Sequence, residues 1–178
     1  AQEILEQLSR KEQIEKMREA IPQQWDTPGM DALPSFAQVD FAVTRDAEGK
    51  LAPKLIELQG FPSLTGLQVV QRDAWNDALH SLDGFDYEWS CWFSGYDRQG
   101  FLDLARRTIV GDHDPAEVVL MDIDPVKQKT YTDFAATKLL FDVDAVDPRS
   151  LTLRGNQLFR EDGTRVRRIY NRVVFDEL

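Results

Sequence analysis

The chain has 178 residues, of which 42% are hydrophobic and 29% charged, and its formal net charge is −10. These values predict one globular domain, or one domain with an extension. The sequence excludes a membrane-spanning helix, because no apolar run approaches the roughly 20 residues that a bilayer requires. The acidic balance argues against nucleic acid, whose binding needs a positively charged face. We therefore expect neither a nucleic-acid partner nor a membrane partner.

A single cysteine, Cys91, excludes an internal disulfide and is typical of the reducing cytoplasm. Its neighbours in EWSCWF are apolar, so we expect a small buried hydrophobe rather than a catalytic thiol. The chain begins inside a helical pattern, AQEILEQ, and ends directly after a strand-like run, NRVVFDEL. We therefore expect it to be part of a longer protein.

Residues 1–20 predict a helix whose apolar residues fall into two short patches. The patches do not share one helical face, so we expect a bend or two separate contact surfaces. Pro22 ends the pattern, and residues 22–35 predict a loop. The patches consist of Ile4, Leu5 and Leu8, and of Ile14, Met17 and Ile21.

Two strand patterns follow, FAQVDFAVT at 36–44 and PKLIELQ at 53–59, separated by the polar turn RDAEGK. This arrangement predicts an antiparallel hairpin. The apolar residues of its second strand indicate a buried strand. A carboxylate there, Glu57, would cost free energy unless something pairs with it.

Residues 65–82 and 98–109 predict two further helices, from apolar residues spaced three and four apart. Between them, residues 83–93 favour a turn and an aromatic stretch with a short strand. Residues 1–115 thus form a helical and hairpin segment.

Residues 116–178 predict an α/β segment, and we expect the whole chain to form one compact unit. A strand at 117–124 precedes a helix at 131–143 and a second short strand or turn. This order predicts a βαβ unit with parallel strands. A hairpin over 151–166 and a final β-rich run at 167–175 complete the chain.

Asp40, Glu57 and Gln59 form the first candidate site. Side chains two residues apart on a strand share a face, so Glu57 and Gln59 point the same way. Asp40 joins them if the register of the hairpin allows. Two carboxylates and an amide oxygen are hard ligands suited to Mg²⁺. The spacing alone leaves another interpretation open, in which all three are polar residues on the solvated face of a hairpin.

The run RVRRIYNR near the C-terminus holds the main basic cluster of this acidic chain. Alternation along a strand would divide its arginines between two faces. A solvated sheet edge and a cluster that grips carboxylate or phosphate both fit this pattern. His113 lies between two aspartates in the turn GDHDP, where a solvated loop is favoured over a metal site. The arginines are Arg165, Arg167, Arg168 and Arg172.

The hairpin sequence VDFAVTRDAEGKLAPKLIELQGFPSL resembles the magnesium-binding hairpin of the circularly permuted ATP-grasp proteins, the group that includes glutathionylspermidine synthase. Asp40 and Glu57 stand where that group has its aspartate and glutamate, and Gln59 stands where it has asparagine. Gln38 occupies the position of an arginine implicated in handling the transferred phosphate. The resemblance implies that Asp40, Glu57 and Gln59 are ligands of Mg²⁺.

The last third resembles the pre-ATP-grasp segment of the same proteins, which is Rossmann-like. The strand VVLMDID, a helix, the step at Asp147-Pro148, the turn at Asp162-Gly163 and the terminal IYNR follow in the family's order. The two resembling segments cover roughly residues 36–65 and 117–175, about half of the chain. We therefore expect an α/β fold that contains a Rossmann-like unit, an antiparallel hairpin and an N-terminal helix.

The resemblance implies an ATP-dependent carboxylate–amine ligase, in which ATP phosphorylates a carboxylate and an amine then displaces phosphate. Mg²⁺ and ATP would be the cofactors of the whole protein. A small-molecule carboxylate or amine, peptide-like or polyamine, would be its substrate. The residues that hold ATP in this family follow the pre-ATP-grasp segment. We therefore expect no cofactor to remain bound to the present chain, and we expect it to be inactive alone.

Asn171 and Arg172 are the candidates for substrate binding on this interpretation. They end a strand at the carboxyl edge of the expected parallel sheet, where ligands of α/β proteins bind. Arg172 can hold a carboxylate or phosphate through two parallel hydrogen bonds. An ion pair of Arg172 with Asp176 or Glu177 is the alternative.

A second function class stays open, a non-catalytic Rossmann-like binding or assembly module with a degenerate metal site. Gln38 and Gln59 favour it, because both depart from the family's pattern. The chain contains no GxGxxG, GxxxxGK[ST], HExxH or GxSxG motif.

Overall fold

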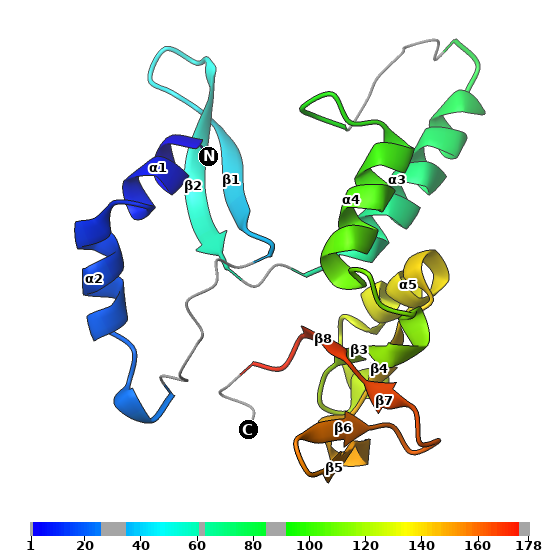
Figure 1. Cartoon of the computed structure of the whole chain (residues 1–178). Coiled ribbons are helices and arrows are strands. Elements are labelled where there is room, and N and C mark those ends of the chain that lie inside the picture. The colour runs from blue at the N-terminus through cyan, green and yellow to red at the C-terminus, as the bar shows by residue number, and fades with distance from the viewer. Residues whose placement is uncertain (1, 26–34, 61–62, 85–91, 175–178) are drawn as a thin grey trace. The chain divides into compact units, whose positions relative to one another are not determined.

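A computed structural model describes residues 2–25, 35–60, 63–84 and 92–174 of the chain (Figure 1). These residues form a mixed α/β structure with five α-helices and three small sheets. The chain divides into two compact units, Ala1–Pro62 and Ser63–Leu178, and each is described by itself. This division differs from the single compact unit, with segments 1–115 and 116–178, that the sequence suggests. The helix over residues 65–80 packs on the helix that follows the first parallel strand, and the helix over 98–109 is hydrogen-bonded to Arg168 of the last strand, so both group with the C-terminal sheets.

The first unit opens with two short helices, α1 (Gln2–Leu8) and α2 (Lys11–Glu19), where one helix with a bend was predicted. The break falls at Ser9, whose hydroxyl donates to the Glu6 carbonyl at 3.0 Å and so competes with the helical backbone. Neither helix buries a residue. The first predicted apolar patch lies on α1, and Ile14 and Met17 of the second lie on α2, whereas Ile21 follows the end of α2.

The predicted hairpin is confirmed as strands β1 (Gln38–Arg45) and β2 (Leu51–Gln59), paired antiparallel (Figure 1). Its turn is fixed by Asp46, whose carboxylate accepts from the backbone N–H groups of Glu48 at 3.0 Å and Lys50 at 2.8 Å. Gly49 takes a φ of +79°, which most side chains disfavour.

A bulge in β2 decides which side chains share a face of the hairpin. Asp40 lies opposite Glu57, but the next residue of β1, Phe41, lies opposite Leu55, so Ile56 has no partner. One extra residue shifts the alternation of β2 by one position. Cross-strand partners point to the same face. The polar face therefore carries Gln38, Asp40, Ala42, Thr44, Ala52, Lys54, Glu57 and Gln59.

The opposite face of the hairpin is apolar, and it is exposed. The expectation that β2 is buried is wrong, because Ile56 at the bulge is 64% exposed and Val43 on β1 is 75% exposed. Every buried hydrophobic side chain among the described residues lies in the second unit. The apolar face consists of Val39, Phe41, Val43, Leu51, Pro53, Leu55 and Leu58, with Arg45 at its turn end.

The second unit is built on a parallel sheet in the order β4-β3-β8. The central strand β3 (Val118–Met121) pairs with β4 (Asp144–Val146) and with β8 (Arg168–Asn171). Helix α5 (Tyr131–Phe141) connects β3 to β4, which confirms the predicted strand–helix–strand order and parallel pairing. Residues 118–120 are fully buried and form the centre of the core.

A separate antiparallel sheet connects β4 to β8. Its strands are β5 (Thr152–Arg154), β6 (Gln157–Phe159) and β7 (Arg165–Val166), in that order. This sheet confirms the predicted hairpin and its second turn, where Gly163 takes a φ of +87°.

Helices α3 (Thr65–His80) and α4 (Arg98–Ile109) complete the second unit, and α3 packs on α5 (Figure 1). The packing is close at Gly66, where a β-carbon would lie 3.0 Å from the Thr137 backbone nitrogen. A larger residue at this position would push the two helices apart.

A buried carboxylate joins α5 to the first turn of α3. Asp133 is 0% exposed, and it accepts from the backbone N–H of Leu67 at 2.9 Å and of Leu64 at 3.2 Å. The first N–H groups of a helix have no partner within the helix. Asp133 therefore supplies the hydrogen-bond acceptors that a local capping residue would otherwise provide. Leu64 itself is left-handed at φ +69° and makes no side-chain cap.

The change Asp133→Asn should lower the free energy of unfolding by about 1–3 kcal/mol. The amide has one acceptor oxygen in place of two, and its N–H₂ group faces a backbone donor. Denaturant unfolding of the 178-residue chain measures the loss. The matched control is Asp77→Asn, an exposed change on α3, for which we expect an effect within about 0.5 kcal/mol. Equal effects of the two variants would contradict this role of Asp133.

Candidate functional site

The hairpin brings together all three side chains of the predicted metal site. The Gln59 amide nitrogen Nε2 donates to Asp40 Oδ2 at 2.9 Å and to Glu57 Oε1 at 2.6 Å. Gln38 Nε2 donates to the other oxygen of Asp40 at 2.8 Å. Two carboxylates therefore face a common point, at which the N–H₂ group of Gln59 now lies.

This hydrogen-bonded cluster combines two carboxylates with one amide. A half turn of the Gln59 amide exchanges its nitrogen and oxygen, and would present Oε1 beside the two carboxylates. The set would then be three hard oxygen ligands, as Mg²⁺ prefers. The role of Asp40, Glu57 and Gln59 as metal ligands stays a prediction.

Clusters of several acidic, histidine or cysteine side chains are the other kind of metal site. Within residues 2–25, 35–60, 63–84 and 92–174, no three or more His, Cys, Asp or Glu side chains gather so that they could hold a metal. The hairpin cluster has two carboxylates and an amide. His113 lies outside any such group in the part of the chain that the structure describes, and Cys91 lies outside the described residues.

A second polar cluster follows the carboxyl edge of the parallel sheet. The backbone N–H of Asp122 donates to the Val146 carbonyl at 3.1 Å, and that of Arg172 donates to the Met121 carbonyl at 2.8 Å. These bonds continue the strand register by one residue and place Asp147, Asp122 and Arg172 in a row across the sheet. Asp122 is only 5% exposed. Asp122 was not among the residues predicted from the sequence, although its position directly after a buried strand is a signal of an edge residue.

The two predicted substrate-binding residues do not share one face. Neighbouring residues of a strand point to opposite sides, so Asn171 and Arg172 diverge. Asn171 turns back on its own chain, because its Oδ1 accepts from the Val173 N–H at 3.2 Å. Arg172 is 7% exposed, and its guanidinium carbon lies 5.9 Å from the centre of the Tyr170 ring. The alternative partners, Asp176 and Glu177, lie outside the described residues.

Asp147 and Arg149 form an ion pair beside this edge. Asp147 accepts from Arg149 Nε at 2.8 Å, from the Arg149 N–H at 2.8 Å and from the Asp124 N–H at 2.8 Å. The hydrogen bonds from the Arg149 guanidinium, followed by those from the two backbone N–H groups, hold the pKa of Asp147 well below its ordinary value. The sequence Asp-Pro-Arg could have indicated that Asp147 caps a helical turn, since aspartate is common before a proline that begins such a turn.

A third feature is an aromatic cavity of about 410 Å³ between α3 and α4. Trp92 packs on Phe101 with ring centres 5.0 Å apart, and the Arg72 guanidinium lies 5.3 Å from the Trp92 ring. Asp73 bridges Arg72 and Arg98, with both ion pairs at 2.7 Å. This cavity was not predicted from the sequence, because it depends on how two helices pack.

The chain matches no protein-family profile, no curated protein and no solved structure. Of the helices in the described residues, none combines the length and the apolar character needed to cross a lipid bilayer.

The change Asp147→Asn should make the stability of the chain less sensitive to acid. A carboxylate with a lowered folded pKa stabilises the fold fully above its unfolded pKa, near 4, and this stabilisation is lost as the pH falls toward the folded pKa. The variant lacks this titration. Its free energy of unfolding, measured by urea denaturation, should therefore fall less than that of the wild type between about pH 4 and pH 2.

The control for this prediction is Asp103→Asn, a change of an exposed carboxylate on α4. Its pH profile should follow that of the wild type. Parallel profiles for the wild type and Asp147→Asn would contradict the effect of the Arg149 ion pair.

Proposed function

We propose that the chain supplies the metal-binding hairpin and a Rossmann-like pre-ATP-grasp segment to a cytoplasmic ATP-dependent carboxylate–amine ligase. The convergence of Asp40, Glu57 and Gln59 on one point supports this proposal most directly. The antiparallel hairpin and the parallel βαβ unit also occur in the order that the resemblance requires.

On this proposal, Asp40, Glu57 and Gln59 hold Mg²⁺. The bound ion would neutralise phosphate oxygens during transfer, which is where such enzymes gain most of their electrostatic stabilisation. Asp40 is oriented by its hydrogen bond from Gln38, which stands at the position of the family's arginine. Here Gln38 positions a carboxylate and brings no positive charge.

The role proposed for Arg172 is to stabilise the negative charge of a small-molecule carboxylate substrate at the edge of the parallel sheet. Its burial lowers the local screening by water and so strengthens such an interaction. The neighbouring Asp122 lies on the same side of the sheet and would fix the guanidinium in place.

A second candidate function, a non-catalytic assembly module, is favoured by a different observation. The Gln59 N–H₂ group satisfies Asp40 and Glu57 without a metal, and the opposite face of the hairpin exposes apolar side chains. An isolated two-stranded hairpin with an exposed apolar face is stabilised by covering that face. On this alternative the polar cluster only fixes the register of the hairpin.

Titration with MgCl₂ in the millimolar range tests the metal site. We expect saturable NMR shifts of the β1 and β2 backbone amides, and an affinity at least roughly tenfold lower for Asp40→Asn, which removes one of the charges that attract the ion. The matched control is Glu48→Gln, the same loss of charge in the turn of the same hairpin. Absence of saturation, or equal losses in both variants, would contradict the metal site.

The change Gln59→Glu separates the two candidate functions. It replaces the bridging N–H₂ group by a third carboxylate, so the three acids repel one another in the absence of a cation. If the site binds Mg²⁺, the variant should bind the ion more tightly than the wild type, because affinity rises with ligand charge. If the NMR signals of the β1 and β2 backbone amides are lost in the variant and MgCl₂ does not restore them, the result would support the assembly module.

A further inference from the structure

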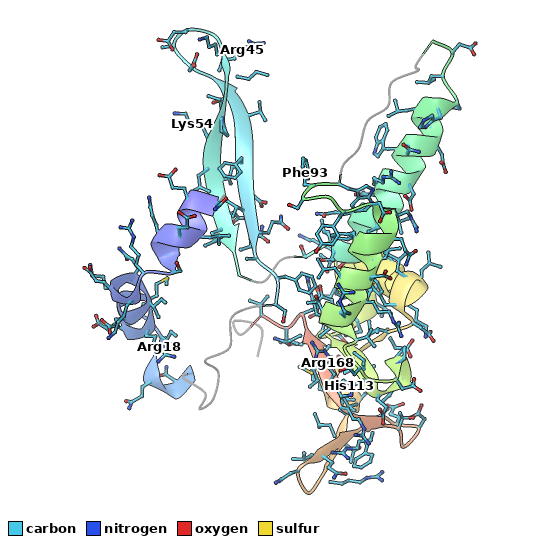
Figure 2. All side chains as sticks on the ribbon, turned by 45° about the horizontal axis from the view of Figure 1, so that its top comes forward. Arg18, Arg45, Lys54, Phe93, His113 and Arg168 are labelled. Carbon is cyan, nitrogen blue, oxygen red and sulfur yellow. The ribbon has the colours of Figure 1, made fainter. Side chains whose placement is uncertain are left out.

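A basic pocket lies at the amino edge of the parallel sheet, at the opposite end of β8 from Arg172. Its volume is about 490 Å³, within the range of small-molecule sites. Figure 2 shows two of its residues, His113 and Arg168, in the lower part of the second unit. The pocket is lined by His113, Asn156, Gln157, Leu158, Arg165, Val166, Arg167, Arg168 and Ile169.

The path of the chain between two sheets creates this pocket. Alternation along one strand would have divided the arginines between two faces. Instead, the chain leaves the antiparallel sheet at the end of β7 and enters the parallel sheet at the start of β8. Arg165, Arg167 and Arg168 therefore line the same hollow, and only Arg172 lies apart from them at the far end of β8.

Two of the three arginines are held in place by their own contacts. Arg168 donates through Nε to the Ile109 carbonyl at 2.9 Å and through Nη2 to the Thr108 carbonyl at 2.6 Å, at the C-terminal end of α4. Both partners are neutral carbonyl groups, so neither contact offsets the Arg168 charge with a carboxylate. Arg167 pairs with Glu117 at 2.8 Å.

Arg165 is the arginine that is available to a ligand. Its side chain is exposed, and within the described part of the chain that side chain makes no hydrogen bond and no ion pair. No described carboxylate lines the pocket, whereas the side-chain amides of Asn156 and Gln157 add neutral donors. Such a concentration of positive charge in a chain of net charge −10 needs a reason beyond solubility.

We propose that this pocket binds a small molecule through a phosphate or diphosphate group. Arginine side chains match phosphate oxygens with several directed hydrogen bonds. Arg165 and Arg168, whose charges are not paired with Glu117 as that of Arg167 is, suit a multiply charged anion better than a single carboxylate. The Arg168 guanidinium is positioned in advance by α4, which lowers the entropy lost on binding. This anion site does not depend on the hairpin, whose carboxylates attract cations.

Isothermal titration of the 178-residue chain with inorganic pyrophosphate, without divalent metal, tests the proposal. Wild type should bind saturably, and Arg165→Gln should lower the affinity roughly tenfold or more, since it removes a charge-assisted contact. The matched control is Arg154→Gln, which changes the same residue type on the same antiparallel sheet. Arg154 packs over the Phe159 ring and does not line the pocket, so this variant should bind within about twofold of wild type.

Three outcomes would overturn the proposal: no saturable binding of pyrophosphate, equal losses in Arg165→Gln and Arg154→Gln, or acetate binding as tight as pyrophosphate. The variant Asp40→Asn separates this result from the hairpin site. It should bind pyrophosphate as wild type does while losing affinity for Mg²⁺. Binding at each site can therefore be measured even if the other site binds nothing.

Discussion

Helix α3 begins on a carboxylate that comes from another helix. Asp133 lies 66 residues beyond Leu67 in the chain, is fully buried, and satisfies two backbone N–H groups that no local side chain caps. This bond fixes where α3 starts, and the contact at Gly66 fixes how closely α3 approaches α5. Since α5 is also the connection between β3 and β4, one buried acid links the helical layer to the parallel sheet. The aromatic cavity is lined in part by α3, so its shape depends on where that helix begins.

Charge is separated between the proposed sites. The hairpin gathers two carboxylates around an amide, whereas the amino edge of the parallel sheet gathers arginines around a hollow. In both places a neutral group fixes the charged ones: Gln38 orients Asp40, and the α4 carbonyls hold Arg168. Neutral partners position a charge without cancelling it, which leaves that charge for an external ligand.

Local patterns in the sequence predicted most of the elements but few of the contacts between them. The 3.6-residue period placed α4 at residues 98–109, and the strand–turn–strand pattern placed the hairpin. Alternation placed Glu57 and Gln59 on one face, but the register was left open, and the pairing of Asp40 with Glu57 depends on the bulge at Ile56. Burial of β2 was wrongly predicted, because an apolar strand does not reveal whether anything covers it. Asp133, the aromatic cavity and the basic pocket escaped prediction, because each depends on residues far apart in the chain.

The bulge at Ile56 has a consequence for how the hairpin tolerates change. Ile56 is 64% exposed and has no cross-strand partner, so its side chain contributes little. However, the one extra residue that Ile56 adds to β2 keeps Leu51 and Leu55 on one face of the hairpin and Glu57 on the other. Loss of that single residue would exchange the faces along half of β2, whereas replacement by almost any other residue would not. The number of residues in β2 is therefore more strictly constrained than the type of residue at position 56.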